Sequence, residues 1–322
     1  MLQPKKMNIS GVLPVYNGEK FIDASLPFIL KNLKDNDELV IINNGSTDNS
    51  NSKLEKWAHS DSRINLITSK TSGLVNALNL GILECCNNWV ARFDIDDNYE
   101  TDRLKHQRAS LNENTVAIFT DYDFFSDSCN YLGNIPSAID ANAVSVSLIS
   151  SQRTAHPSIL FNKEAVINAG GYREIDFPAE DLSLWLRMSR LGDLVSVPKT
   201  LLHYRLSADS ITGKRRVESK EMTRKLLTEI GINQRNILGL IENFETVQQL
   251  YTQHNYTRER ELLMLRDLYY LSKNMHNNKL MKKINQLLII STSKLALNIS
   301  SFRAIRLLYK EQSLRNKIRN SR

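Results

Sequence analysis

The 322-residue chain has few cysteines, and none at the spacing that disulfide or metal frameworks need. It contains three: Cys85 and Cys86 are adjacent, and Cys129 is alone. They cannot form a set of paired disulfides or a CxxC metal site, which favours a reducing compartment. No run approaches the ~18 consecutive apolar residues of a membrane span, and residues 1–10 lack the apolar core of a secretion signal. The sequence therefore predicts a cytoplasmic protein.

Several short motifs that identify common enzyme classes are also absent. No GxGxxG follows the first apolar run and no GxxxxGK[ST] occurs, so dinucleotide and P-loop binding are not expected. HExxH and GxSxG are missing as well, and the six histidines lack the spacing of metal ligands. Because these motifs are absent, any active site of this protein must be built from residues outside them.

Charge is distributed unevenly along a chain whose composition, 41% hydrophobic and 24% charged, is that of a globular protein. Residues 1–213 carry a net charge of −6, whereas residues 214–322 carry +13 and have helical patterning without proline. We expect a domain over residues 1–213 and a basic helical region over residues 214–322. This region either packs on the domain or binds the anionic inner face of the plasma membrane. Its few aromatics argue against nucleic acid as a partner.

Short apolar runs alternate with helical patterns in the first part of the chain. This alternation predicts an α/β fold, a parallel sheet with helices on both faces. Ligands of such sheets bind beyond the carboxyl ends of the strands. Polar clusters follow three strand ends, at residues 16–17, 43–44 and 94–97, so we expect them to converge. The predicted strands are residues 8–15, 38–42, 64–67, 88–93, 116–120 and 159–161, and the predicted helices are 19–33, 48–58, 74–86 and 181–191.

Three carboxylates lie within four residues at Asp94, Asp96 and Asp97, directly after a predicted buried strand. Such a cluster is costly unless a cation neutralises it. Mg²⁺ and Mn²⁺ prefer oxygen ligands, and they are often held by one or two carboxylates together with substrate phosphates. The cluster is therefore a metal site for a diphosphate substrate, or else an acidic loop or a helix N-cap beside Asn98.

Two carboxylates, Glu180 and Asp181, stand at the start of a predicted helix. A carboxylate there either caps the helix or serves as a general base that takes the proton of an attacking hydroxyl. The strand-end loops, residues 14–17 and 43–48, have two interpretations as well. They form ordinary turns, or their aromatic ring and amides bind a nucleobase.

The order and spacing of these pieces resemble the family 2 glycosyltransferases, which have the GT-A fold, a Rossmann-like and mostly parallel mixed sheet. The resemblance covers about 200 residues, and its strength lies in the ordered set rather than in any one motif. The matching segments are residues 10–19, 43–48, 73–81, 91–97, 102–104, 156–158, 170–172, 180–186 and 201–205.

The resemblance implies an inverting, metal-dependent enzyme that uses Mn²⁺ or Mg²⁺. Asp181 would be the catalytic base and Glu180 would support it. Asp94 and Asp96 would bind the metal, with Asp94 also near the ribose. The nucleotide pocket would be lined by Pro14, Tyr16, Asn17, Asn43, Gly73, Arg92 and Asp94.

Two positions depart from the family pattern. The family commonly has two aspartates where this chain has Asn43 and Asn44, which leaves the nucleobase preference open. Relatives often carry a histidine where this chain has Ser207, so a phosphate or metal contact from that position is not expected. His203 lies nearby, but a histidine in a strand is more often a packing residue than a ligand.

The resemblance implies transfer of a sugar from a nucleotide donor, a UDP-sugar being expected, to a glycan acceptor. The expected setting is bacterial surface polysaccharide, such as O-antigen or capsule, built on a lipid-diphosphate carrier at the inner face of the membrane. Two alternatives remain: a nucleotidyltransferase and a non-catalytic scaffold that binds sugar nucleotides. The first would have a glycine- and lysine-rich N-terminal loop, but residues 11–18 contain no lysine or arginine. The presence of Asp181 argues against the second.

Overall fold

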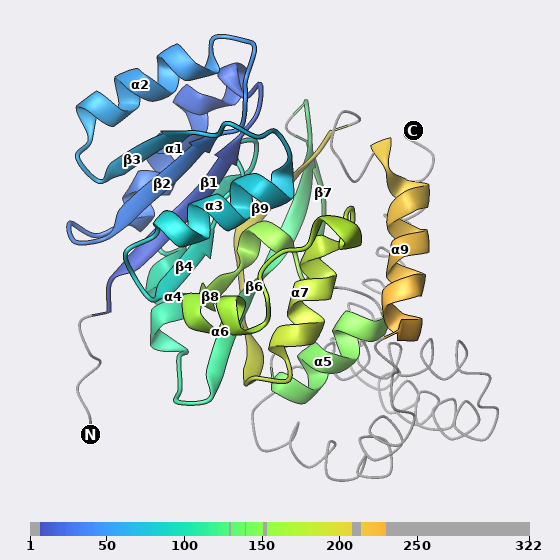
Figure 1. The fold of residues 1–322 in the computed structure, drawn as a ribbon. Helices are drawn as coiled ribbons and strands as arrows, with labels where there is room; N and C mark the ends of the chain where they lie inside the picture. Colours follow the sequence, from blue (N-terminus) through green and yellow to red (C-terminus); the bar gives the residue numbers. More distant parts are fainter. Residues whose placement is uncertain (1–6, 129, 139, 151–152, 208–213, 230–322) are drawn as a thin grey trace, which may run out of the picture.

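The computed structural model describes residues 7–128, 130–138, 140–150, 153–207 and 214–229. Within them, nine strands form one mixed sheet in the order β3-β2-β1-β4-β8-β6-β9-β5, with β7 paired to β6 (Figure 1). The strands are β1 (Ile9–Val15), β2 (Glu38–Asn43), β3 (Ile64–Thr68), β4 (Trp89–Arg92), β5 (Asn98–Tyr99), β6 (Thr115–Ser126), β7 (Tyr131–Ile135), β8 (Leu160–Asn162) and β9 (Asp193–Leu206).

The strands β1 to β4 are parallel, as their alternation with helices predicts. β1 lies between β2 and β4, with Val12 paired to Val40 on one side and to Arg92 on the other. Beyond β4, the short β8 is antiparallel to β4 and β6, and β6 then pairs in parallel with β9. This arrangement brings the carboxyl ends of β1, β2 and β4 to one edge of the sheet.

Helices cover both faces of the sheet because successive residues of its strands point to opposite sides. Leu13 and Ile41 belong to one apolar core, which α1, α2 and α4 cover, whereas Val12 and Ile42 belong to the core beneath α3, α5, α6 and α7 (Figure 1). The helices are α1 (Glu19–Asn32), α2 (Ser50–Ser60), α3 (Leu74–Glu84), α4 (Arg103–Ala109), α5 (Ala141–Ser150), α6 (Lys163–Asn168), α7 (Glu180–Met188) and α9 (Arg216–Glu229), with 3₁₀ turns at His156–Ser158 and Glu174–Asp176.

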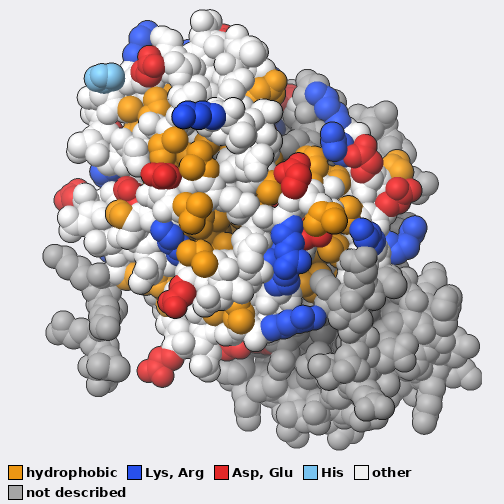
Figure 2. Space-filling view, viewed as in Figure 1, with side chains coloured by type: hydrophobic (Ala, Val, Ile, Leu, Met, Phe, Trp, Pro, Cys, Tyr) orange, Lys and Arg blue, Asp and Glu red, His pale blue; other side chains and the backbone are white. Residues whose placement is uncertain are grey.

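The helix α3 lies unusually close to the centre of the sheet. A Cβ on Gly81 would stand 2.4 Å from Cγ2 of Val12 and 3.2 Å from Cγ1 of Ile42. Only glycine allows this approach, and it brings the α3 residues near the site. On the face shown in Figure 2, apolar side chains emerge in small groups among charged and polar ones, as on most globular surfaces.

Several predicted boundaries differ from the structure. The helix predicted from residue 48 begins at Ser50, because the Asp48 carboxylate accepts the Ser50 N–H just before the helix. The strand predicted at residues 116–120 extends over Thr115–Ser126, where parallel pairing with β9 continues it. Among the described residues, no helix is long and apolar enough to cross a membrane. Of the predicted basic region, α9 is helical, and residues 230–322 lie outside the described residues.

Candidate active site

The predicted convergence of the three polar clusters is confirmed at the carboxyl ends of β1, β2 and β4. The loops after β1 and β2 are joined, since the Asn17 Oδ1 accepts the Thr47 N–H at 2.8 Å. Asn17 adopts a left-handed backbone conformation with φ of 50°, which asparagine tolerates better than most residues. The acidic cluster adjoins them, because the Ile95 side chain packs against the backbone of Gly18.

The candidate nucleotide-binding residues lie along this edge. The Tyr16 side chain is 61% exposed, so its ring is open to a ligand. Pro14 lies in β1 beside Ile42 of β2, and Gly73 stands immediately before α3 with a positive φ of 120°. The exposed ring of Tyr16 at this edge of the sheet can therefore contact a ligand.

Asn43 is buried, and its amide already makes hydrogen bonds within the protein. Its Oδ1 accepts the Ser46 N–H at 3.2 Å, and its Nδ2 donates to Asn51 Oδ1 at 2.8 Å. One amide hydrogen and one oxygen lone pair remain for a nucleobase. The Asn43 side chain thus shapes the loop as well as standing at the predicted base-binding position.

The acidic loop after β4 brings carboxylate oxygens of Asp94, Asp96 and Asp97 within 4.8 Å of one another. Asp97 Oδ1 accepts the backbone N–H of Arg205 at 2.8 Å, and the Arg205 Nε donates to the Asp96 carbonyl at 2.8 Å. Asp97 Oδ2 is buried without a hydrogen-bond partner among the described residues. Arg205 therefore holds the loop from β9, whereas the alternative of a helix cap is excluded because β5 follows.

Burial and neighbouring negative charges both disfavour the ionised forms of Asp96 and Asp97. Burial, followed by the charge of Asp94, raises the pKa of Asp96 to about 6. Burial and the charge of Asp96 raise the pKa of Asp97 well above its usual value. Oxygen ligands that lie this close and ionise with difficulty fit a hard divalent cation, which would stabilise their charged forms.

The second pair of carboxylates begins α7. Burial and the neighbouring Asp181 raise the pKa of Glu180 to about 8. Burial also raises the pKa of Asp181, although its side chain keeps 33% of its surface exposed. Asp181 Oδ1 accepts the Leu182 N–H at 2.7 Å, and its Oδ2 lies 4.0 Å from Nδ1 of His156. The raised pKa of Glu180 favours its protonated form at neutral pH, and Asp181, the more exposed of the two, is the carboxylate placed to accept a proton.

Arg92, at the end of β4, connects the two carboxylate groups. Its guanidinium pairs with Asp94 at 2.7 Å, and its positive charge partly offsets the rise in pKa that burial causes at Asp96, Glu180 and Asp181. The backbone N–H of Arg92 donates to the carbonyl of Ile159, directly after the His156–Ser158 turn, and His156 lies 4.0 Å from Asp181, so the acidic loop and the start of α7 both adjoin this end of β4. Asp96 and Asp181, 85 positions apart in the chain, therefore belong to one region of the molecule.

Some residues of this region were not among the predicted site residues. Arg205 holds the acidic loop, and His156 with Tyr172 adjoins Asp181. The segments 156–158 and 170–172 carried the resemblance, but nothing in the sequence placed them beside α7. His203, which was not among the expected ligands, contacts two carboxylates of the protein: its Nδ1 lies 2.8 Å from Asp123 Oδ1 and its Nε2 lies 3.2 Å from Glu100 Oε1.

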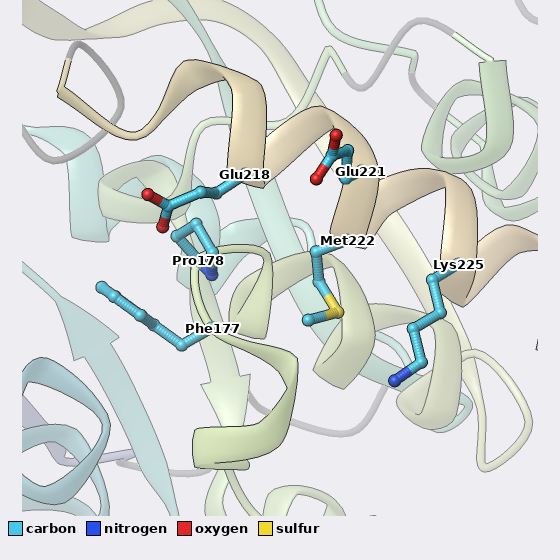
Figure 3. Close-up of a pocket in the computed structure, with 6 residues that line it drawn as sticks. All are labelled: Phe177, Pro178, Glu218, Glu221, Met222 and Lys225. Carbon is cyan, nitrogen blue, oxygen red and sulfur yellow. The ribbon is translucent and has the colours of Figure 1, made fainter.

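A recess of about 330 Å³ lies where α9 meets the segment that leads into α7 (Figure 3). Arg215 stands over the ring of Phe177 at 5.1 Å and pairs with Glu218 of α9 at 3.2 Å. The segment that precedes the two α7 carboxylates is thereby held against α9. The recess is lined by Phe177, Pro178, Glu218, Glu221, Met222 and Lys225.

A family model described as glycosyl transferase family 2 matches residues 10–143. An uncharacterized glycosyltransferase of Haemophilus influenzae is 29% identical over 241 residues, 69% of this chain and 72% of that protein. The O-antigen biosynthesis glycosyltransferase WbnJ of Escherichia coli is 27% identical over 203 residues, 62% of this chain and 79% of its own. An E. coli UDP-Gal:alpha-D-GlcNAc-diphosphoundecaprenol beta-1,3-galactosyltransferase is 27% identical over 220 residues, covering 66% of this chain and 77% of the enzyme. A glycosyltransferase of Rickettsia bellii is matched over 29% of its length.

Two solved structures are similar over nearly the whole chain. The S. aureus TarS fragment 1–349 in complex with UDP has a TM-score of 0.58 at 15% identity, covering 98% of this chain and 92% of that one. The mannosyltransferase PcManGT of Pyrobaculum calidifontis, in complex with GDP-Man and Mn²⁺, has a TM-score of 0.56 at 14% identity, covering 98% and 88%. At this identity the likeness shows the fold, which is GT-A, as predicted.

Proposed function

Because the chain belongs to glycosyl transferase family 2, we propose that it is an inverting, metal-dependent glycosyltransferase. It transfers one sugar from a UDP-sugar to a lipid-linked glycan and serves bacterial surface-polysaccharide assembly. The observation that carries this proposal is the position of Arg92 between two carboxylate groups. One group suits a metal and a diphosphate, and the other suits deprotonation of an alcohol.

The donor side of the site is assigned to the acidic loop. Asp96 and Asp94 would hold a divalent ion, which screens the two phosphates of the donor when it is bound. Arg92 orients Asp94 by donating to both of its oxygens. The exposed Tyr16 ring would stack on the nucleobase, with Pro14, Asn17, Asn43 and Gly73 around it.

The acceptor side is assigned to the start of α7. The acceptor oxygen attacks the anomeric carbon as the bond from that carbon to the diphosphate oxygen breaks, and the hydroxyl proton moves to Asp181. One displacement from the face opposite the leaving group inverts the anomeric centre. The raised pKa of Asp181 makes it a stronger base than a solvated aspartate. Glu180, protonated at neutral pH, adds no second negative charge beside it.

The similar proteins support the substrate classes. The E. coli galactosyltransferase has a name that gives a UDP-sugar donor and a diphosphoundecaprenol-linked acceptor, and WbnJ is named for O-antigen biosynthesis. The TarS structure contains UDP, and the PcManGT structure contains Mn²⁺. A lipid-linked acceptor favours a place at the inner face of the membrane.

A thermal-shift screen of nucleotide sugars, with Mn²⁺ or with a chelator, tests the donor side. A donor that binds only the native state stabilises it by about 2.7 kcal/mol at a concentration of 100 Kd. We expect a UDP-sugar to raise the melting temperature with Mn²⁺, and Asp96→Asn to abolish the metal-dependent part. Asp23→Asn, which changes a surface aspartate paired with Lys53, is the control and keeps the shift. A screen in which no nucleotide sugar raises the melting temperature would contradict the proposal.

A further inference from the structure

The geometry points to His156 and Tyr172 as a positioning pair for Asp181, in which the phenol fixes the tautomer of the histidine and the histidine orients the carboxylate. This inference rests on the proposed function, because it concerns the residue assigned as the base. The His156 Nε2 lies 2.6 Å from the Tyr172 hydroxyl, and its Nδ1 lies 4.0 Å from Asp181 Oδ2. The imidazole thus stands between the phenol and the carboxylate.

Tyr172 is held in place through its backbone. Asn79 of α3 accepts the Tyr172 N–H at 3.0 Å and donates to the Tyr172 carbonyl at 2.9 Å. Gly170 and Gly171, just before it, have φ of 83° and 65°, in the left-handed region that favours glycine. The two glycines turn the chain after α6, and the α3 amide then locks the tyrosine.

His156 is held by aromatic contacts. Its ring meets the edge of Trp185 at 5.5 Å and an interplanar angle of 82°, and it lies over the Tyr172 ring at 5.3 Å. Trp185 follows Asp181 by four residues in α7, so both side chains lie on the same face of the helix. The contact that packs the imidazole therefore also aligns it with the carboxylate.

The charge of the Asp181 carboxylate determines which tautomer His156 adopts. A lone pair on Nδ1 would repel the ionised Asp181, whereas an Nδ1–H is attracted to it, so Nδ1 carries the ring proton. Nε2 is then the acceptor, and the Tyr172 hydroxyl donates to it. Burial and the charge of Arg92 keep the pKa of His156 well below its usual value, and burial raises that of Tyr172, so both stay neutral.

The 4.0 Å separation is longer than a hydrogen bond, and such contacts often tighten only when substrate binds. With Oδ1 held by the Leu182 N–H, an Nδ1–H directed at Oδ2 fixes the rotation of the carboxylate. It also favours the ionised form of Asp181 against burial. The charged and titratable groups that act on Asp181 besides His156 are Arg92, Glu180 and Tyr172.

Two substitutions of His156 distinguish the roles of its two ring nitrogens. An asparagine amide can replace Nδ1 and keep a donor toward Asp181, whereas a glutamine amide reaches the position of Nε2 and keeps only the contact with Tyr172. We expect His156→Gln to lower kcat about tenfold with the KM for donor unchanged, and to move the acidic limb of the kcat–pH profile upward. His156→Asn should retain more activity, and Tyr172→Phe should fall between them.

A readout independent of activity is the tautomer itself. In protein labelled with ¹⁵N-histidine, the His156 signal, assigned by its loss in His156→Gln, should report a protonated Nδ1 and an unprotonated Nε2. Tyr172→Phe should weaken this preference. A protonated Nε2 in the unaltered protein would overturn the inference, as would His156→Gln with unchanged kcat and pH profile.

Asp181→Asn distinguishes a failure of this inference from a failure of the proposed function. If Asp181→Asn is inactive while His156→Gln is unaffected, the positioning pair is wrong and the base stands. If Asp181→Asn transfers sugar normally, the base assignment itself is wrong. Donor binding and melting temperature, measured on each variant, exclude a loss of folding as the cause.

Discussion

Arg92 binds Asp94 through both carboxylate oxygens, with Nη2 2.7 Å from Oδ1 and Nη1 2.8 Å from Oδ2. The arginine is buried at the end of β4, and Asp94 keeps 23% of its side chain exposed at the start of the acidic loop. Such a bidentate pair fixes the orientation of the Asp94 carboxylate. The positive charge of Arg92 also favours the ionised forms of Glu180 and Asp181, against the effect of burial.

Replacement of Arg92 by lysine should weaken the interactions within the site, although it keeps the positive charge. An ammonium cannot bind both oxygens of Asp94 in the same plane, so we expect a stability loss of about 1–3 kcal/mol and weaker donor binding. Arg92→Ala should cost more, since it leaves the carboxylates without a counter-charge. Chemical denaturation and donor titration measure both effects, and equal stability of Arg92→Lys and the unaltered protein would contradict this role.

The raised pKa of Glu180 predicts a dependence of stability on pH. The group binds its proton up to about pH 8 in the folded protein, against a usual value of 4.5. Its contribution is therefore fully present below pH 4.5 and is lost as the pH rises through 8. Glu180→Gln, which stays neutral, should flatten the fall in unfolding free energy over this window in metal-free buffer. An unchanged slope would show that Glu180 ionises normally.

The turn before Tyr172 can be tested with two matched glycine substitutions. Gly171→Ala and Gly45→Ala both force a side chain to adopt positive φ, at a cost of about 1–2 kcal/mol each. A Cβ at Gly171 would also stand 3.0 Å from Asn79 Oδ1, whereas a Cβ at Gly45 meets nothing within 4 Å. Thermal unfolding should therefore show the larger loss for Gly171→Ala. Equal losses would mean that Asn79 does not fix the turn.

The periodicity of the sequence was sufficient to predict the first half of the sheet. Strands β1 to β4 are short apolar runs between helices, and local patterning decides such elements. The length of β6 was not predicted, because its second half, from Asp121 to Ser126, is extended by pairing with β9 and β7 rather than by its own composition. Long-range pairing of this kind leaves little trace in a local window.

The candidate site was predictable where its residues follow strand ends. The acidic loop and the start of α7 could be named from carboxylate spacing, but the role of Arg92 between them depends on tertiary packing. Asn43 illustrates the same point, because its hydrogen bonds to Ser46 and Asn51 come from the loop conformation. The partners of His203 could not be predicted locally either, since Asp123 belongs to β6 and Glu100 follows β5, the two strands that flank β9.

The most direct test of the account is transfer and donor binding measured on Asp181→Asn with a lipid-linked acceptor. Asparagine keeps the shape of the side chain and cannot take the proton of the acceptor hydroxyl. We predict that the donor still binds with Mn²⁺, and that transfer falls by about 10²–10⁴-fold, the usual contribution of a general base. Transfer at the rate of the unaltered protein would contradict the assignment of the base and, with it, the proposed mechanism.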